Sequence, residues 1–279
     1  MSGRPPLAFS IDFEGFTEAM EESFPVPERF SRFGIEEELE ANAEACLAVL
    51  AAHGVRGTFF FLGWIGREFP ALVRRIAEAG HEIGSHSLYH RRLWNLPEDE
   101  ALAAIRESKA LLEEASGQAV VGFRAPDFSL HPGSTLLDRL AELGFRYDAS
   151  LNPTDLHDVY GDANVPARIH RLESGLVELP ASVCRLPGGR RMTVGGGGYF
   201  RLFPGWLTRR WLRAAEHPVC YLHPCEIGGV YPREVPMSML RRLRHTWGNG
   251  RLGGKLKRLF AEFQAMPVLD FLKVHDALD

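Results

Sequence analysis

Two carboxylates stand close together near the start of the chain. Asp12 and Glu14 flank Phe13 at the end of an apolar, β-prone run over residues 7–13. Successive side chains of a strand point to opposite faces, so both carboxylates are expected on the same side. One could then bind a metal ion while the other accepts a proton, although a carboxylate pair at a strand end can also simply cap loop N–H groups.

Two histidines, His86 and His90, lie four residues apart in the sequence HSLYH. If this stretch is helical, both imidazoles lie on one face at a separation that one ion can bridge. Two histidines and one carboxylate leave coordination positions open for water and substrate, as a catalytic metal requires. Alone, the pair is equally compatible with surface or capping histidines. Combined with Asp12 and Glu14, it predicts a hydrolytic metal site.

An arginine and a third histidine stand at the ends of two further apolar runs. Arg124 ends the run 120–124, and His223 follows the run 219–222. Arg124 could keep a nearby carboxylate ionised and oriented, or form an ordinary salt bridge, and His223 could be a satisfied core histidine. Their positions at strand ends favour a place in the same site.

Apolar runs and helical periodicities alternate along most of the chain. Runs bounded by turn residues predict strands at 7–13, 55–61, 81–84, 120–124, 145–149, 176–180 and 219–222. Apolar residues at helical spacing predict helices at 36–53, 70–79, 97–116, 134–143 and 204–215. This alternation indicates an α/β fold with a parallel sheet, either open or closed into a barrel, whose chemistry collects at the carboxyl ends of the strands.

The last part of the chain does not continue this alternation. We therefore expect a main catalytic domain over residues 1–227. Residues 228–279 are expected to form an irregular C-terminal extension that packs on it.

Five short motifs follow one another between residues 7 and 227. They read S-I-D-F-E, R-G-T-F-F-F-L-G, G-H-E-I-G-S-H-S-L-Y-H, F-R-A-P and Y-L-H-P. Together they resemble the ordered motifs of the polysaccharide deacetylases of the NodB homology class. A later stretch, G-G-G-Y-F-R-L-F-P with L-H-P-C-E-I, is similar to a subgroup associated with exopolysaccharide biosynthesis. The resemblance implies a distorted (β/α) barrel with fewer than eight units and one divalent metal ion, zinc first and cobalt or another transition metal next.

The resemblance also implies a role for each residue of the site. Asp12 becomes the general base, Arg124 the group that orients it, and His223 the general acid. The implied metal ligands are Glu14, His86 and His90. The implied substrate-binding residues are Tyr89, Pro126, Tyr199 and Leu222. Stabilisation of the oxyanion is implied for the metal and for a backbone N–H near Tyr89 or Ala125.

Two departures from the family pattern bear on these roles. The usual adjacent aspartates are replaced by Asp12 and Glu14 with Phe13 between them, and the usual Asp-Trp pair that helps to hold the catalytic histidine is absent. Relatives with such departures sometimes hydrolyse other amides, including cyclic imides and ureides. The carboxylate that orients His223 is therefore open among Asp148, Asp155, Asp158 and Glu226.

Charge is distributed unevenly along the chain. The net charge is -4, yet residues 185–258 hold fifteen Lys and Arg against three Asp and Glu. This basic region also carries Trp206, Trp211 and Trp247, so it is either a solvated surface or one that meets phosphates, an acidic glycan or anionic lipid. Peripheral contact with the inner membrane and a homo-oligomer both stay open, whereas no recognised motif supports nucleic-acid binding.

The N-terminus and the hydropathy pattern bear on location. No window reaches the length of a membrane span, and the opening residues 1–6 lack the apolar run and cleavage site of a signal peptide. A cytoplasmic protein is expected.

Three functions follow from these patterns. The leading one is removal of an N-acetyl group from an amino sugar that is nucleotide-linked, lipid-linked or part of a nascent polysaccharide, and the basic region suits a phosphate-bearing substrate. The second is an amidohydrolase that acts on a small non-sugar cyclic imide or ureide through the same site. The third is a non-catalytic glycan-binding module, against which the intact set of Asp12, His86, His90 and His223 argues.

Overall fold

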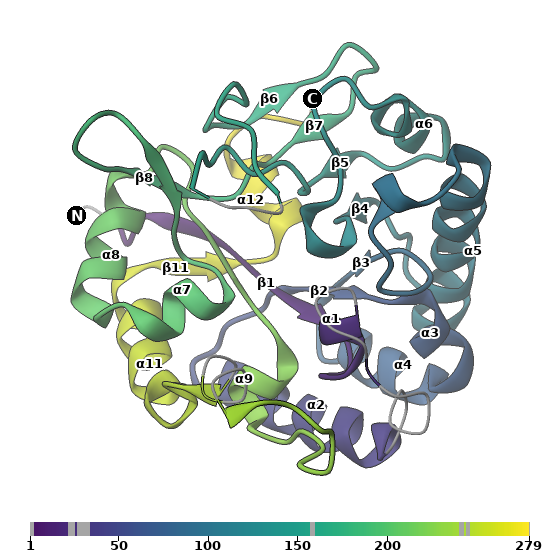
Figure 1. The fold of residues 1–279 in the computed structure, drawn as a ribbon, viewed down its shortest axis with the longest axis horizontal. Coiled ribbons are helices and arrows are strands. Elements are labelled where there is room, and N and C mark those ends of the chain that lie inside the picture. The colour runs from purple at the N-terminus through teal and green to yellow at the C-terminus, as the bar shows by residue number, and fades with distance from the viewer. Residues whose placement is uncertain are drawn as a thin grey trace.

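A curved sheet organises the chain (Figure 1). The computed structural model describes residues 3–21, 26, 34–156, 160–239, 243 and 246–278. Within these residues the main sheet has nine strands, eight of which follow the order β10-β1-β2-β3-β4-β5-β7-β6. In that order they are Val219–Leu222, Pro6–Phe13, Thr58–Phe61, Glu82–Ser85, Gly122–Phe123, Tyr147–Asp148, Val177–Glu178 and His170–Arg171.

The sheet forms an open, distorted barrel. Neighbouring strands are parallel except for β6 and β7, which are antiparallel. The end strands β10 and β6 are not paired with each other in the described part of the chain, so the barrel does not close. Each predicted strand is present, although several are shorter than predicted.

Helices surround this sheet. The five predicted helices correspond to α2 (Ile35–Ala52), α4 (Pro70–Glu78), α5 (Glu98–Ser116), α6 (Thr135–Glu142) and α8 (Gly205–Ala214). On α2, Leu39, Ala43, Cys46 and Leu50 are buried, because their spacing places them on the face toward the sheet. Figure 1 shows α2, α4, α5 and α6 around the outer side of the strands. The other described helices are α1 (Glu18–Glu21), α3 (Gly63–Glu68), α7 (Gly197–Leu202), α9 (Pro224–Gly228), α11 (Leu252–Glu262) and α12 (Val268–Val274), with 3₁₀ turns at Leu93–Asn95, Pro126–Phe128 and Asn249–Arg251.

Strand β1 sorts its side chains by the period of two. Leu7, Phe9, Ile11 and Phe13 are buried in the main core, which also contains the apolar faces of the helices. The alternate positions point to the other side, where Ala8 joins a second apolar cluster with Phe60 and Tyr147. Ser10, Asp12 and Glu14 continue this inner row toward the carboxyl end of the strand. The inner row therefore begins apolar and ends polar, which places the carboxylates at the end of the barrel where chemistry is expected.

The C-terminal region is not an irregular tail, and that prediction is wrong. Strand β11 (Gln264–Met266) pairs with β1 in parallel, as Pro6 lies opposite Gln264. Helix α12 begins directly after it, and the Val268 N–H donates to the hydroxyl of Thr58 at 2.8 Å. Figure 1 shows β11 and α12, in yellow, beside the strands of the barrel. A boundary at residue 227 stays a prediction, but the region beyond it supplies part of the sheet.

Other short elements escaped prediction as well. Strands β8 (Val183–Arg185) and β9 (Arg191–Thr193) form a separate antiparallel hairpin. Each is only three residues long and carries arginine, so neither has the apolar signature of a buried strand. None of the described helices has the length and apolar character that a membrane crossing requires.

Candidate active site and metal centre

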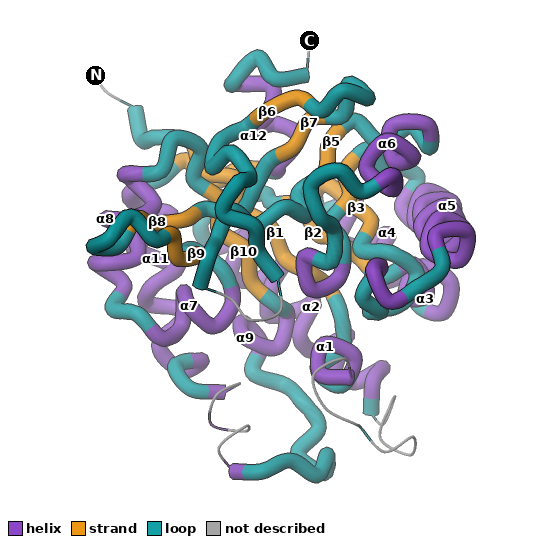
Figure 2. The backbone as a smooth tube through the Cα atoms, turned by 45° about the horizontal axis from the view of Figure 1, so that its top comes forward, coloured by secondary structure: helices purple, strands orange, loops and turns teal. Residues whose placement is uncertain are grey.

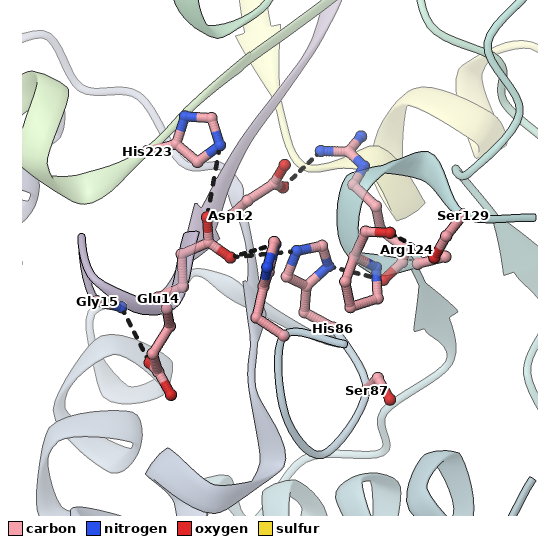
Figure 3. A network of polar contacts seen from close by, with 12 residues as sticks. Asp12, Glu14, Gly15, His86, Ser87, Arg124, Ser129 and His223 are labelled. Carbon is pink, nitrogen blue, oxygen red and sulfur yellow. Dashed lines mark hydrogen bonds and ion pairs between the residues drawn. The ribbon is translucent and has the colours of Figure 1, made fainter. Parts of the chain in front are cut away.

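The predicted site residues meet at the carboxyl ends of four strands. Asp12 and Glu14 lie at the end of β1, His86 follows β3, Arg124 follows β4, and His223 follows β10. Figure 3 shows their side chains converging from these separate strands. All but His223 are almost completely buried.

Glu14 and the two histidines of HSLYH form a compact cluster of donor atoms. Glu14 Oε2 lies 3.0 Å from His90 Nε2 and 3.5 Å from His86 Nε2. One donor atom from each residue falls within 4.8 Å of the other two. The dashed lines in Figure 3 trace these contacts around the Glu14 carboxylate.

The segment from His86 to His90 is a loop, so the conditional prediction of a helix there is wrong. Ser87 takes a left-handed backbone conformation with φ 67°. Its carbonyl oxygen accepts hydrogen bonds from Gly63 N at 2.8 Å and from Ser108 Oγ at 2.9 Å. These bonds fix the turn, which brings the His86 and His90 rings to a centroid distance of 5.5 Å without helical geometry.

Glycine is required beside this loop. A Cβ atom on Gly63 would lie 2.5 Å from Ser108 Cα, closer than real Cβ contacts allow. The bare backbone of Gly63 therefore lets α3 and α5 approach closely enough for both to bind the Ser87 carbonyl.

The donor atoms fit a divalent transition metal. Within the described residues Glu14 Oε2 is buried without a hydrogen-bond partner, although two imidazole nitrogens face it. His86 Nδ1 donates to the Arg124 carbonyl at 2.7 Å, which leaves Nε2 as the nitrogen that can bind an ion. Two imidazoles and one carboxylate form a ligand set that suits zinc and related ions. Buried polar atoms normally have partners, and an ion bound here would supply one for the unpaired carboxylate oxygen.

Asp12 is held by Arg124 on the other side of the site. Arg124 Nη1 donates to Asp12 Oδ1 at 2.7 Å and to Ser10 Oγ at 2.8 Å, while Nε donates to the Ala149 carbonyl at 3.1 Å. The guanidinium also lies 4.4 Å from the centre of the Phe60 ring. These contacts leave Arg124 a single orientation, and Asp12 Oδ1 is fixed with it.

His223 is oriented by Glu226, one of the four candidates that the sequence left open. His223 Nδ1 donates to Glu226 Oε2 at 3.0 Å, and the His223 backbone N–H donates to the same oxygen at 2.8 Å. The other oxygen, Glu226 Oε1, accepts a hydrogen bond from Arg201 Nε in a buried ion pair. His223 Nε2 is thereby turned toward Glu14, at 3.6 Å from Oε1. Asp148 and Asp155 bond elsewhere, to Ser150 and to Arg190 and Arg191, and Asp158 lies outside the described residues.

Known protein families match the chain in two adjoining segments. The Polysaccharide deacetylase model matches residues 34–147, and a domain of unknown function, DUF3473, matches residues 149–273. A peptidoglycan-N-acetylglucosamine deacetylase from Bacillus cereus is 39% identical over 77 residues, which are 28% of this chain and 28% of that protein. A chitooligosaccharide deacetylase from Azorhizobium caulinodans is 27% identical over 161 residues, which are 54% of this chain and 75% of that protein.

Residues 34–147 of the chain thus form a segment of the polysaccharide deacetylase family.

Solved structures of similar fold extend the match to nearly the whole chain. A Mycobacterium smegmatis protein described as a polysaccharide deacetylase has a TM-score of 0.64 at 22% identity, covering 98% of this chain and 91% of its own. Puue allantoinase has a TM-score of 0.62 at 18% identity, covering 97% of this chain and 89% of its own. At these identities the likeness establishes the fold, and it confirms the predicted distorted barrel.

Both matched segments of the chain contribute to one site. His86, His90 and Arg124 lie in residues 34–147, whereas His223 lies in residues 149–273. Asp12 and Glu14 precede both matches. The segment of unknown function is therefore not a separate module, because its residues complete the site.

Burial and neighbouring charges shift the pKa values of three groups in the candidate site. Burial raises the pKa of Glu14, but the charge of His90 and contacts with both histidines outweigh it and lower that pKa well below its usual range. Burial lowers the pKa of His223, but the hydrogen bond to Glu226 and the charge of that carboxylate raise it to about 9. Without an ion His90 behaves similarly, since the charge of Glu14 outweighs burial and raises its pKa to about 9. Glu14 therefore stays ionised, as a ligand to a cation must be.

The residues implied in substrate binding lie in different surroundings. Tyr89 is exposed at the surface and its hydroxyl bonds to Arg67, and Tyr199 is partly exposed and stacks against Phe203. Pro126 is buried beside the site in the 3₁₀ turn after Arg124.

Two expectations for substrate contacts do not fit the structure. Leu222 is fully buried in the main core, so its side chain offers no surface to a ligand and instead anchors β10 below His223. The backbone N–H of Ala125 donates to Ser150 Oγ at 2.8 Å, so this N–H is not available to an oxyanion.

Two residues that position groups of the candidate site were not predicted. Ser10, which helps to fix Arg124, lies two residues before Asp12, so the period of two along β1 could have revealed it. Arg201, which binds Glu226, comes from α7, 25 residues away, and no local pattern links the two.

Replacing a ligand should abolish metal binding. In His86→Ala, we expect the roughly one equivalent of divalent metal bound by the wild type to be lost, because two donor atoms hold an ion far more weakly than three. Elemental analysis of the purified proteins measures this. His131→Ala is a matched control, since His131 is exposed and stacks on Trp94. Equal metal content in wild type and His86→Ala would contradict the assigned ligands.

Proposed function

We propose that this protein is a metal-dependent hydrolase that removes an N-acetyl group from an amino sugar within an oligosaccharide or polysaccharide. The observation that carries the proposal is the position of Glu14. Its Oε2 faces His86 and His90, its Oε1 faces His223, and Asp12 lies two residues earlier on the same side of β1. This arrangement supports a metal-binding cluster, a proton acceptor and a proton donor in one site.

The chemistry divides among these groups. Glu14, His86 and His90 would hold a divalent ion, which lowers the pKa of water and polarises the acetyl carbonyl when it is bound. The chain's own residues must then move two protons: one from the attacking water, and one onto the departing amine.

Asp12 is the proposed general base. Arg124 occupies its Oδ1, so Oδ2 is the oxygen left to accept a proton. This hydrogen bond to the positive guanidinium fixes the orientation of the carboxylate. Ser10 and the Ala149 carbonyl hold the arginine, so Asp12 is oriented before substrate arrives.

His223 is the proposed general acid. Its Nδ1 proton is committed to Glu226, so the proton on Nε2 is the one that can be transferred to the amine. The raised pKa keeps the imidazole protonated at neutral pH, as an acid requires. With 30% of its side chain exposed, His223 is also the most accessible of the site residues to an entering substrate.

The family supports a sugar amide as the substrate. The relatives reported above are named for deacetylation of peptidoglycan N-acetylglucosamine and of chitooligosaccharides. An amidohydrolase acting on a cyclic imide or ureide is the second candidate, since Glu14 and its spacing from Asp12 depart from the family pattern. A panel of imides and ureides tested beside N-acetyl sugars separates the two.

Several finer properties stay proposals. They are zinc as the ion, a substrate that carries phosphate or is linked to nucleotide or lipid, a cytoplasmic location, contact with the inner membrane and assembly into a homo-oligomer.

The proposed reaction predicts acetate release that depends on Asp12. The zinc-loaded wild type should release acetate from N-acetylglucosamine oligomers, and Asp12→Asn should lower kcat by about 10²–10⁴-fold because the amide cannot take the water proton. Acetate is measured by an enzyme-coupled assay, and metal content is checked in parallel. Unchanged turnover in Asp12→Asn would overturn the assignment of the base.

Glu226 should matter for turnover but not for metal binding. Glu226→Gln is expected to lower kcat by about 10–100-fold with little change in KM, because the neutral amide no longer stabilises the protonated imidazole. Asp155→Asn is a control, since Asp155 pairs with Arg190 outside the site. A fall in metal content that parallels the fall in kcat would instead indicate a purely structural role for Glu226.

A further inference from the structure

A groove of about 1070 Å³ lies on the surface away from the site residues. One wall is α8 and the other includes the β8–β9 hairpin, and Figure 1 shows these elements side by side at the left of the molecule. Figure 2 shows the same neighbourhood after rotation. All of its lining residues fall within residues 149–273, the segment of unknown function.

The groove carries an excess of positive charge. Its charged lining residues are Arg185, Arg191, Arg209, Arg210 and Arg213 against Glu216 and Glu262. Glu262 is shared by Arg209 at 2.7 Å and Arg213 at 3.0 Å, so one carboxylate faces two guanidinium groups.

Two of these arginines are available to a ligand. Arg185 and Arg210 are exposed and have no ion-pair partner in the part of the chain that the structure describes. They belong to opposite walls, since Arg185 ends β8 and Arg210 lies on α8. Arg191 is held in the groove by a hydrogen bond from its Nη1 to the Val165 carbonyl at 3.0 Å, so its positive charge is positioned but not neutralised there by a carboxylate.

Aromatic surface accompanies the charge. Trp206 stands at the groove with 63% of its surface exposed, which is unusual for so large an apolar side chain. Trp211 also lines the groove and is braced by an edge contact with Phe203 at 5.0 Å. A flat aromatic face can stack on the C–H face of a sugar ring, while planar guanidinium groups match carboxylates or phosphates.

The groove is distinct from the proposed catalytic centre. Ser182 lines it and accepts a hydrogen bond from the backbone N–H of Val219, the first residue of β10, at 2.7 Å. His223 follows the other end of the same strand, about 13 Å away at about 3.3 Å per residue. A long chain bound in the groove would therefore be held on the same molecule as the site without occupying it.

We propose that this groove binds an anionic polysaccharide. Its concave shape suits a chain lying between two walls, whereas a bilayer offers a flat surface. The choice of a polysaccharide over a single-stranded nucleic acid rests on the proposed function, because charge and stacking alone would serve either. A bound polymer would have its neighbouring sugars kept at high local concentration near His223.

Binding to a polyuronate tests the proposal directly. The probe is an alginate oligomer, measured by calorimetry with the metal-loaded full chain, beside a neutral dextran oligomer, poly(U) and vesicles containing anionic lipid. We expect the alginate oligomer to bind and dextran not to bind, with affinity falling as salt rises. The double variant Arg185→Glu/Arg210→Glu should weaken alginate binding by about tenfold or more.

A matched charge change serves as the control. Arg106→Glu/Arg139→Glu makes the same change in charge on α5 and α6, which Figure 1 places on the other side of the molecule. It should leave alginate binding unchanged. Trp206→Ala, which alters only an exposed side chain, should also weaken alginate binding. This variant tests the proposal if Arg185→Glu/Arg210→Glu does not fold.

The outcomes separate this proposal from the proposed reaction. Acetate release from short neutral oligomers should be the same in Arg185→Glu/Arg210→Glu and wild type, so failure of the reaction leaves the binding result interpretable. Equal loss of alginate binding in both double variants would show that net charge alone governs binding, and this would overturn the proposal. Absence of alginate binding, or tighter binding of vesicles or poly(U) that depends on Arg185 and Arg210, would overturn it too.

Discussion

Burial of the negatively charged Glu14 carboxylate determines how the site is arranged. A buried anion without compensation is costly, and removing one partner from a buried ion pair costs about 3–5 kcal/mol. Glu14 is surrounded by three imidazoles: those of His86 and His90, which follow β3, and that of His223, which follows β10. The charge that makes the cluster attractive to a metal ion therefore also ties distant parts of the barrel together.

Contacts between site residues also connect the two matched segments of the chain. The residues that hold Glu14 and orient Asp12 follow β3 and β4, whereas His223, Glu226 and Arg201 belong to the segment of unknown function. Beyond them, Arg201 Nη1 donates to the Trp247 carbonyl at 2.8 Å, which links the orienting pair to the C-terminal region. The C-terminal region in turn supplies β11, which pairs with the first residues of β1. Both segments are thus needed for a complete site.

Much of this arrangement could be predicted from the sequence, because periodic patterns within one segment reveal which residues are buried. Features that depend on contacts between distant residues could not be predicted. Burial of α2 and β1 follows from their periods of 3.6 and 2, and the site residues were located by their positions at strand ends. The left-handed turn at Ser87 depends on bonds from Gly63 and Ser108, which no spacing within HSLYH reveals. The choice of Glu226 over other carboxylates likewise depends on Arg201, and the short β11 is recognisable only beside β1.

Anomalous diffraction from crystals of the zinc-loaded protein, recorded on both sides of the zinc absorption edge, tests whether Glu14, His86 and His90 bind the ion. We expect one strong peak within bonding distance of Glu14, His86 Nε2 and His90 Nε2, with Asp12 still bound to Arg124. A peak elsewhere, for example at the cysteines, or none in a protein that releases acetate, would contradict it.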